Sequence, residues 1–544
     1  MHLRFLAILL FAAPASANEI HVPANQPTIQ QAVLAAVDGD TIVVHPGTYS
    51  EKLDLLGKAL TLRSSDGADA TFLQPPGGSP TLLIQSSVPL SGTVRLEGFT
   101  IQNAWPAVSL SGGTVEVVDN VFTNNQSTDI ALSACQGISI RGNAFATGAS
   151  DTTAIDLTNC TGEIALNTVT QHPKGCVFLS QASSVHVHHN VFKDSGNYGG
   201  WAPAIGLWTN AGSLTTVDHN LFLRNAGHAI DAGNSGAAID ADILSNRFVG
   251  NTNGAGGSVL ACALNTGTLR FEGNFCEGPA LTSGYVGEMI RADIGTITLR
   301  NNVFWHNQDV NSVLWTRTVD FIGSTVTLEN CLFHTVEMAA GKWQAPLTIG
   351  TDSILWDLSI ASLPWAGVGI DFQNTDVGPT PYGGSTTISV DPMFVDPAGG
   401  DFHLLAGSPC IDPLTSATTV TTDAEGRARD ASPDYGPYEY TGHALWYLGA
   451  GEAGAAMKVV FQGQPGETVV LGYGKGLLPS PITTVFGDVW ISGLRTTPVL
   501  GTIGSNGILE VPFVAPPWTT PRLYFTQALL GSTLTGVQQV LLGG

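Results

Sequence analysis

The sequence predicts an all-β solenoid, in which one short coil of chain is repeated along an axis, followed by a smaller β domain. A phrase of the form apolar-x-x-Asn-x-Phe recurs along the chain, for example at 187–192 and 217–222. The composition agrees, because 64 Gly and 30 Pro against only 21 Lys and Arg favour turns and strands over helices. A chain of 544 residues is also too long for one ordinary globular core, so several domains or a repeat are expected.

The Asn of this phrase marks the repeat. From Phe99, in the slot before the first marker, to Cys331, in the slot after the last, successive markers are 21 to 30 residues apart: Asn120, Asn143, Asn167, Asn190, Asn220, Asn246, Asn274 and Asn302. A period in this range without a helical pattern indicates one solenoid coil per repeat. Because side chains alternate along a strand, the apolar residues three before and two after each marker share the inner face. Stacked coils then form a phenylalanine stack in the bore and an asparagine ladder at a turn.

Both ends of the repeat region carry further recognisable segments. Residues 27–37 form an amphipathic stretch before the strand-like run 39–44, and a solenoid needs such a cap because its open end exposes core and strand edge. Residues 391–412 are similar to a closing coil. Together with the Asn-x-Phe phrases, these segments resemble the right-handed parallel β-helix (pectin-lyase-like) superfamily, and in it bacterial secreted β-helix repeat proteins of unassigned activity. The resemblance covers about residues 20–440 and implies the fold, but not one activity, since this fold hosts lyases, hydrolases, esterases and adhesins.

Three regions are expected along the chain. Residues 1–17 are predicted to be a signal peptide, with Arg4, a short apolar run and a small-x-small cleavage site at 15–17. Residues 18–440 form the β-helix, with a capping helix at 27–37. Residues 441–544 contain six strand-like runs between Gly/Pro turns, which predicts a β-sandwich-like domain. This domain is either a surface-attachment or carbohydrate-binding module or a cap and folding unit, and both interpretations stay open.

Charge and cysteine content narrow the partners. The formal net charge of −23 argues against nucleic-acid binding, because attraction to phosphates needs clustered Lys and Arg. So acidic a chain could recruit divalent cations, with Ca²⁺ as the candidate ion, although solubility in an extracellular medium explains the charge more simply. No later stretch is apolar enough for a membrane helix, so we expect a secreted or cell-surface protein. Seven cysteines leave at least one unpaired.

The catalytic motifs of the known β-helix enzymes are largely missing. A lyase needs an Arg or Lys base and a hydrolase needs two carboxylates that face the bond. Residues 188–192 resemble a pectate lyase phrase, but 195–203 lack the arginine that such an enzyme uses as its base. Residues 374–376 echo a polygalacturonase motif and 47–51 the opening of pectin methylesterases, without the remaining catalytic phrases of either family. The expected function is therefore binding of extracellular polysaccharide or a surface role; the alternative is a lyase or glycoside hydrolase acting near residues 163–242.

The candidate site follows from the repeat register. Positions four, two and one before the marker should face outward, which gathers histidines and carboxylates on neighbouring coils. Such a group could bind a transition metal or act as acid and base, while the simpler interpretation is an exposed polar sheet face. The candidate catalytic residues are His188, His189, Lys193, Asp218 and His219. The candidate binding residues are Glu163, His186, Asp194, Trp201, Trp208, Arg224 and Asp242, and they include residues of a long Gly-rich coil that starts beside the histidines.

Overall fold

The computed structural model describes residues 17–544 except for 79, 147–151, 197–201, 210–212, 234–238, 252–259, 263–266, 279–289, 293–294, 306–318, 322–323, 336–347, 358–369, 380–385 and 414–418. The predicted signal peptide lies outside the described residues, apart from Ala17. Among the described residues, no helix combines the length and the apolar composition that crossing a bilayer requires.

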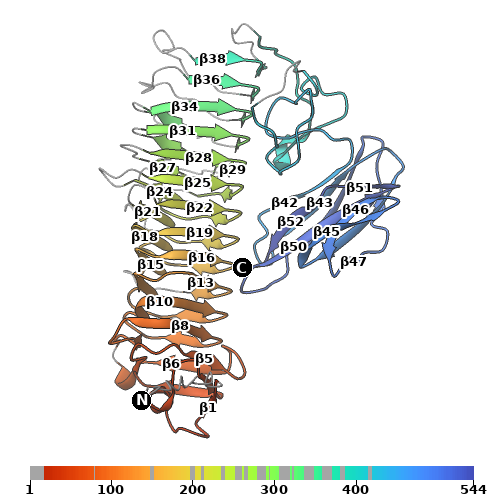
Figure 1. Ribbon diagram of the computed structural model, residues 1–544. Coiled ribbons are helices and arrows are strands. Elements are labelled where there is room, and N and C mark those ends of the chain that lie inside the picture. Colours follow the sequence, from red (N-terminus) through yellow and green to blue (C-terminus); the bar gives the residue numbers. More distant parts are fainter. Residues whose placement is uncertain are drawn as a thin grey trace, which may run out of the picture.

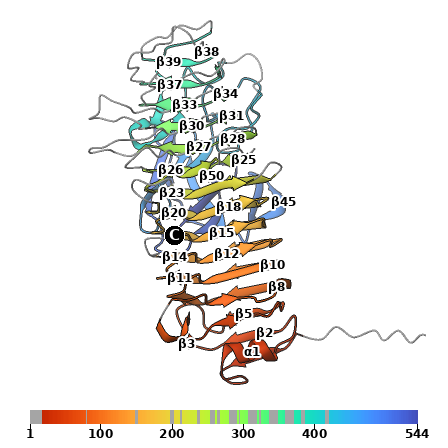
Figure 2. The same cartoon turned by 90° about the vertical axis from the view of Figure 1, so that its left-hand side faces the viewer.

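Parallel strands stack into three faces, which we call sheets A, B and C (Figures 1 and 2). Sheet A contains β1 (Glu19–Val22), β2 (Thr41–Val44), β5 (Thr61–Ser64), β8 (Leu90–Glu97), the second part of β10 (Val108–Val118), β13 (Ile138–Arg141), β16 (Thr161–Ala165), β19 (Ser184–His188), β22 (Leu214–Asp218), β25 (Asp240–Leu244), β28 (Thr268–Glu272), β31 (Gly295–Arg300), β34 (Ser324–Glu329), β36 (Thr348–Thr351) and β38 (Ile370–Gln373). Sheet B contains β3 (Gly47–Ser50), β6 (Thr71–Gln74), β9 (Thr100–Gln102), β11 (Val121–Thr123), β14 (Ala144–Ala146), β17 (Thr168–Thr170), β20 (Val191–Lys193), β23 (Leu221–Leu223), β26 (Arg247–Val249), β29 (Phe275–Glu277), β32 (Val303–Trp305), β35 (Leu332–His334), β37 (Ile354–Trp356) and β39 (Asp376–Gly378). Sheet C contains β4 (Leu53–Asp54), β7 (Ile84–Gln85), the first part of β10, β12 (Ile130–Ser133), β15 (Ile155–Thr158), β18 (Val177–Gln181), β21 (Ile205–Thr209), β24 (Ile230–Ala232), β27 (Leu260–Cys262), β30 (Ile290–Ala292) and β33 (Val319–Phe321). The predicted all-β solenoid is thus confirmed.

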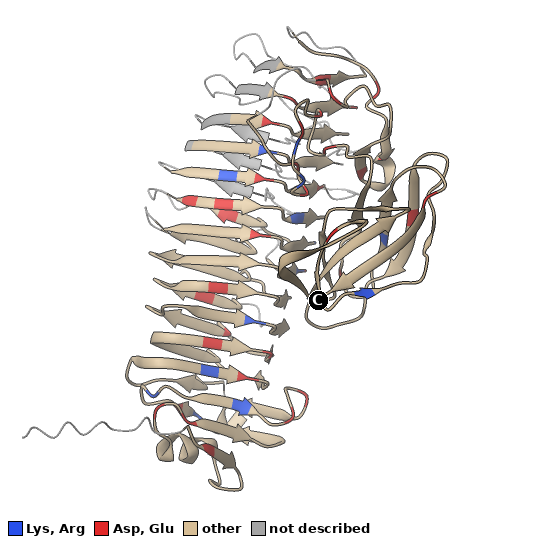
Figure 3. Ribbon diagram, turned by 45° about the vertical axis from the view of Figure 1, so that its right-hand side comes forward, with Lys and Arg blue, Asp and Glu red and all other residues tan. Residues whose placement is uncertain are grey.

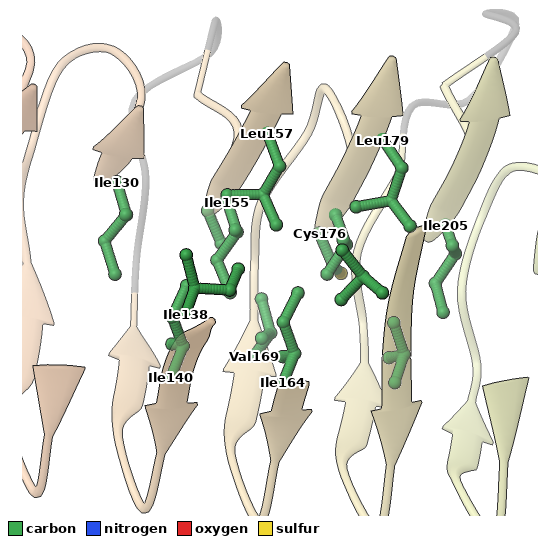
Figure 4. Close-up of a cluster of buried hydrophobic side chains, with 14 of the residues drawn as sticks. Ile130, Ile138, Ile140, Ile155, Leu157, Ile164, Val169, Cys176, Leu179 and Ile205 are labelled. Atoms are coloured by element: carbon green, nitrogen blue, oxygen red, sulfur yellow. The ribbon is translucent and has the colours of Figure 1, made fainter. Parts of the chain in front are cut away.

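Apolar columns fill the bore. The residues three before and two after each marker are buried, as the alternation predicts, and neighbouring coils place them in register, for example Val187 opposite Val217. Phe192, Phe222 and Phe248 stack with ring centroids 5.2 and 4.7 Å apart. Aliphatic side chains replace the rings around Val169 (Figure 4). The bore is therefore a continuous hydrophobic core, in which burial of apolar surface stabilises each coil on the next.

The predicted asparagine ladder runs along the bend between sheets A and B. The Asn190 side-chain amide donates to Oδ1 of Asn220 at 2.9 Å, and Asn220 donates to Oδ1 of Asn246 at 3.0 Å. The same Oδ1 atoms accept the backbone N–H of the preceding marker, as in Asn190 N–H to Asn220 Oδ1 at 2.9 Å. These buried amides satisfy backbone groups that the bend removes from the sheet ladders.

A short helix covers the first coil. Helix α1 (Ile29–Ala35) lies within the expected 27–37 and buries Ile29, Ala32 and Val33 against the first strands. Thr28 caps it by accepting from the backbone N–H of Gln31, and Glu51 accepts from two further N–H groups of the first turn. The end of the solenoid is closed in this way.

The segment expected to form a closing coil has a different arrangement. Strands β40 (Phe394–Asp396) and β41 (Asp401–Leu404), joined by the 3₁₀ turn η2 (Pro397–Gly399), pair antiparallel rather than extending a sheet of the solenoid. Phe402 packs on Trp305 with ring centroids 5.7 Å apart, on the outer side of sheet B. The expectation of a closing coil was wrong, because outward-facing aromatic residues of sheet B bind this hairpin to the side of the stack.

The C-terminal region is a small antiparallel β domain beside the solenoid (Figure 1). One sheet contains β42 (Ala444–Leu448), β43 (Ala456–Gln462) and β49 (Ile508–Val514); a second contains β44 (Thr468–Gly474), β47 (Arg495–Thr496), β48 (Gly501–Thr502), β50 (Arg522–Leu530), β51 (Thr533–Leu534) and β52 (Gln538–Leu542); β45 (Gly476–Thr484) and β46 (Gly487–Ser492) form a hairpin. Leu445 and Phe461 of the first sheet share a core with Val469 and Leu530 of the second. The predicted fold class of this region is confirmed.

Candidate functional site

The histidines and carboxylates gather on the outer face of sheet A. Strand β19 directs His186 and His188 outward, and its register places Glu163 of β16 beside His186 and Asp218 of β22 beside His188. Parallel coils repeat at about 4.8 Å, so side chains of three coils meet here. We call Glu163, His186, His188 and Asp218 the histidine patch.

Short contacts connect the members of the histidine patch. His186 Nε2 lies 2.9 Å from Asp218 Oδ1, and His188 Nε2 lies 3.6 Å from Glu163 Oε2. The rings of His186 and His188 are 4.1 Å apart. One potential ligand atom each from His186, His188 and Asp218 lies within 4.8 Å of the others, and this is the only such group of three found in the described part of the chain. It combines two imidazoles with one carboxylate, whereas Ca²⁺ prefers oxygen ligands alone.

His189 and His219 occupy the bend next to the histidine patch. Both backbones are left-handed, with φ of 54° and 52°, and their rings stack at 5.0 Å. His189 Nδ1 lies 2.9 Å from His188 Nδ1, while His219 Nδ1 lies 3.6 Å from Asp218 Oδ2. The bend turns these two rings toward the C-terminal domain, where they line a cavity of about 180 Å³.

Burial sets the protonation of this cluster. It lowers the pKa of His189 to about 4, with the neighbouring His219 and His188 acting in the same direction. Burial also lowers the pKa of His188, and His186 adds to the effect. At Asp218 burial acts in the opposite sense, but hydrogen bonds and charge from His219 and His186 lower its pKa overall. Neutral imidazoles therefore lie beside an ionised carboxylate at neutral pH.

Three of the candidate residues hold the C-terminal domain. Arg224 forms paired contacts with Glu452 at 2.9 and 3.0 Å and with Asp194 at 2.9 and 3.1 Å. Lys193 donates to the backbone carbonyl of Gly544 at 2.9 Å and lies 3.5 Å from Glu452. These side chains thus lie at the seam between the two domains rather than on the open face.

The remaining candidates are dispersed. Asp242 lies on the next coil and pairs with Arg270 at 3.3 Å. Trp208 belongs to β21 of sheet C, around a bend from sheet A, and its ring lies 4.8 Å from that of Phe178. Trp201 lies outside the described residues.

A polar groove lies on sheet A below the histidine patch, between the first coils and the C-terminal domain. Its volume is about 600 Å³, and its charged lining consists of Asp66, Asp69, Arg95, Asp119, Arg141 and Arg522. Arg95 is bound to Glu97 and Glu116 at 2.7 and 2.6 Å. Within the described ranges, neither Arg141 nor Arg522 has a carboxylate within 4.0 Å, and Arg522 instead lies over the ring of Trp518 at 4.5 Å.

The sequence analysis did not select this groove. Arg141 could have been found, because it occupies an outward position two before its marker. Arg522 comes from the C-terminal domain, and no pattern in the sequence places that domain against the early coils. Figure 3 shows the result, with both signs of charge distributed along the outer face of the stack.

Comparisons with known proteins agree with this architecture. Residues 90–276 match a family model described as a right handed beta helix region. The solenoid is a right-handed parallel β-helix. No curated protein sequence matches the chain.

Three solved structures with low similarity are examples of what the β-helix is like. They are the PL6 family alginate lyase AlyGC, with 17% identity over 72% of this chain and 56% of that one at a TM-score of 0.43; the alginate lyase AlyF-OU02 in complex with G6, with 12% identity over 66% and 84% at 0.39; and a tailspike protein of E. coli bacteriophage HK620 in complex with a pentasaccharide, with 10% identity over 96% and 86% at 0.26. The chain spans just over half the length of AlyGC. At such low similarity, the function has to be argued from the residues of this chain.

Proposed function

We propose that this protein is a secreted β-helix that binds extracellular polysaccharide in the polar groove of sheet A. One observation carries the proposal: the groove is elongated, polar and contains two guanidinium groups, those of Arg141 and Arg522, that form no ion pair with the described residues. Unsatisfied donors of this kind are available to a ligand.

The shape of the groove suits a chain-like ligand. Its lining residues follow β5, β8, β10, β13 and β16, which are successive coils of the solenoid. Four coil-to-coil steps of about 4.8 Å give a length of roughly 19 Å. A small metabolite would fill only part of such a groove, whereas consecutive units of a polymer could occupy it.

The chemistry of the lining suits sugars. Guanidinium donors from Arg141 and Arg522 alternate with carboxylate acceptors from Asp69 and Asp119. A sugar hydroxyl both donates and accepts, so it matches such a mixed lining, and a uronate carboxylate would add a charge-assisted pair with either arginine. Nucleic acid remains disfavoured by the net charge of −23.

Binding can be tested by affinity electrophoresis and calorimetry on a panel of uronate and neutral polysaccharides. We expect one class of glycan to bind, and Arg141→Ala and Arg522→Ala to weaken it by about tenfold each, since a charge-assisted hydrogen bond contributes roughly 1.5–3 kcal/mol. Arg63→Ala is the matched control, because Arg63 is also a sheet A arginine but pairs with Glu19 outside the groove. Absence of binding across the panel, or equal losses in all three variants, would refute the proposal.

A polysaccharide lyase or glycoside hydrolase is the second candidate function. The observation in its favour is the neutral His188 beside Glu163, with the His186–Asp218 pair next to them, since these are groups that can exchange protons with a substrate. Incubation with the bound glycan tests it: new reducing ends, or the 235-nm absorbance of an unsaturated uronate, should appear and be lost in His188→Ala. Intact glycan after prolonged incubation would exclude this activity.

A further inference from the structure

We infer that His186, His188 and Asp218 form a binding site for a divalent transition-metal ion on the outer face of sheet A. The inference is independent of the polysaccharide groove, which involves none of these three residues.

The fold brings the three ligands together without a contiguous motif. His186 and His188 are two residues apart on β19, so both side chains project from the same face. Asp218 is opposite His188 on the next coil. The backbone of three hydrogen-bonded strands therefore holds the ligand positions before any ion binds, which lowers the entropy cost of assembling the site.

The distances are close to those that an ion requires. Metal–ligand bonds of about 2.0–2.2 Å hold the ligand atoms of a tetrahedral site roughly 3.4 Å apart. The three potential ligand atoms lie within 4.8 Å of one another, and His186 Nε2 and Asp218 Oδ1 are already at 2.9 Å. Rotations about side-chain bonds by a fraction of an ångström to about one ångström would complete the arrangement, and no backbone change is needed.

Neighbouring groups orient the ligands. His188 has one ring nitrogen 2.9 Å from His189 and the other 3.6 Å from Glu163. Asp218 has its second oxygen 3.6 Å from His219. Partners of this kind fix ring orientation in protein metal sites, and their loss typically lowers metal affinity by 10–100-fold.

The ligand set selects the type of ion. Two imidazoles and one carboxylate suit Zn²⁺, Co²⁺, Ni²⁺ or Cu²⁺ better than Ca²⁺ or Mg²⁺. Side-chain exposures of 47% for His186, 21% for His188 and 18% for Asp218 leave the site accessible to solvent. Three protein ligands also leave a fourth position for water or for an oxygen of another molecule.

A second histidine pair in the chain provides a control. His21 Nδ1 and His45 Nε2 are 3.1 Å apart, and His21 also lies 3.6 Å from Glu19, but these residues do not form a group of three convergent ligands. If any exposed pair of histidines on this solenoid captured an ion, this pair would do so as well.

The test is a titration of chelator-treated protein with Co²⁺, followed by visible absorption, and with Zn²⁺, followed by calorimetry. We expect one ion per chain, Zn²⁺ displacing Co²⁺, and no displacement by Ca²⁺. His186→Gln and Asp218→Asn should each lower the affinity by about 100-fold or more, while His45→Gln should leave it unchanged.

Circular dichroism and thermal unfolding of each variant establish that it is folded before its affinity is compared. Absence of saturable binding, or binding that is lost in His45→Gln but kept in Asp218→Asn, would overturn the inference. Glycan binding should persist in the chelator-treated protein, so failure of the metal site and failure of the groove give different results.

Discussion

Replacing a single rung of the asparagine ladder should destabilise the β-helix strongly. Asn220 is 2% exposed; its amide donates to the carbonyls of Val187 and Asp218 and to Asn246, and its Oδ1 accepts the backbone N–H of Asn190. In Asn220→Ala the N–H of Asn190 has no other recorded acceptor, and two buried carbonyls lose a donor. A buried polar group left unsatisfied costs about 1–3 kcal/mol, so we expect a loss of roughly 3–5 kcal/mol.

Urea unfolding followed by circular dichroism checks this value. The control is Gln126→Ala, since Gln126 is an exposed amide residue of the same β-helix whose side chain makes no recorded hydrogen bond, and its loss should cost no more than about 0.5 kcal/mol. If Asn220→Ala unfolded at the same urea concentration as Gln126→Ala, the ladder would not be a main source of stability and the reasoning would be refuted.

Two further predictions concern the closing hairpin and the domain seam. Burial opposes the charge on His403, but Glu425 and Asp401 raise its pKa to about 9, above the unfolded value of 6.5; its contribution to stability is therefore complete below pH 6.5 and is lost as the pH rises through about 9, roughly 3 kcal/mol in all. Urea unfolding at about pH 6 and pH 10 should show this loss, and His403→Gln should remove most of it. Glu452→Gln should loosen the contact of the C-terminal domain by about 1 kcal/mol, because exposed pairs contribute little, and hydrogen exchange at the seam should rise relative to Glu510→Gln, which breaks a pair inside that domain.

The repeat could be predicted from the sequence because it depends on local alternation and on stacking of like on like. Inner positions such as Val217 and Phe222 have to be apolar, and the marker Asn220 has to reach its neighbour, so the pattern survives in each coil. Where Val169 and Cys276 replace Phe, burial is kept although the aromatic stack is interrupted. The same register correctly put His188 and Asp218 on one outer face.

The domain seam could not be predicted in the same way. Arg224 and Glu452 are separated by 228 residues, and neither belongs to a pattern that the other shares. The sequence analysis therefore assigned Lys193 and Arg224 to an open site, whereas the structure shows them in contact with the C-terminal domain. Trp208 was placed near the histidines for a related reason: its coil begins beside them, but the chain turns onto sheet C before reaching it.

The solenoid separates the residues that determine its fold from those available for chemistry. Inner positions are constrained by stacking, whereas the outward positions four and two before each marker tolerate any polar side chain. A functional cluster on such a surface is assembled across coils, so His186 and its partner Asp218 are 32 residues apart although their atoms touch. A search for contiguous catalytic motifs cannot detect such a cluster, which is why the missing enzyme phrases do not exclude chemistry here. The polar groove ends at Leu166, directly after the strand that carries Glu163, so the two proposed sites are neighbours on one face and can be tested separately by variants that belong to only one of them.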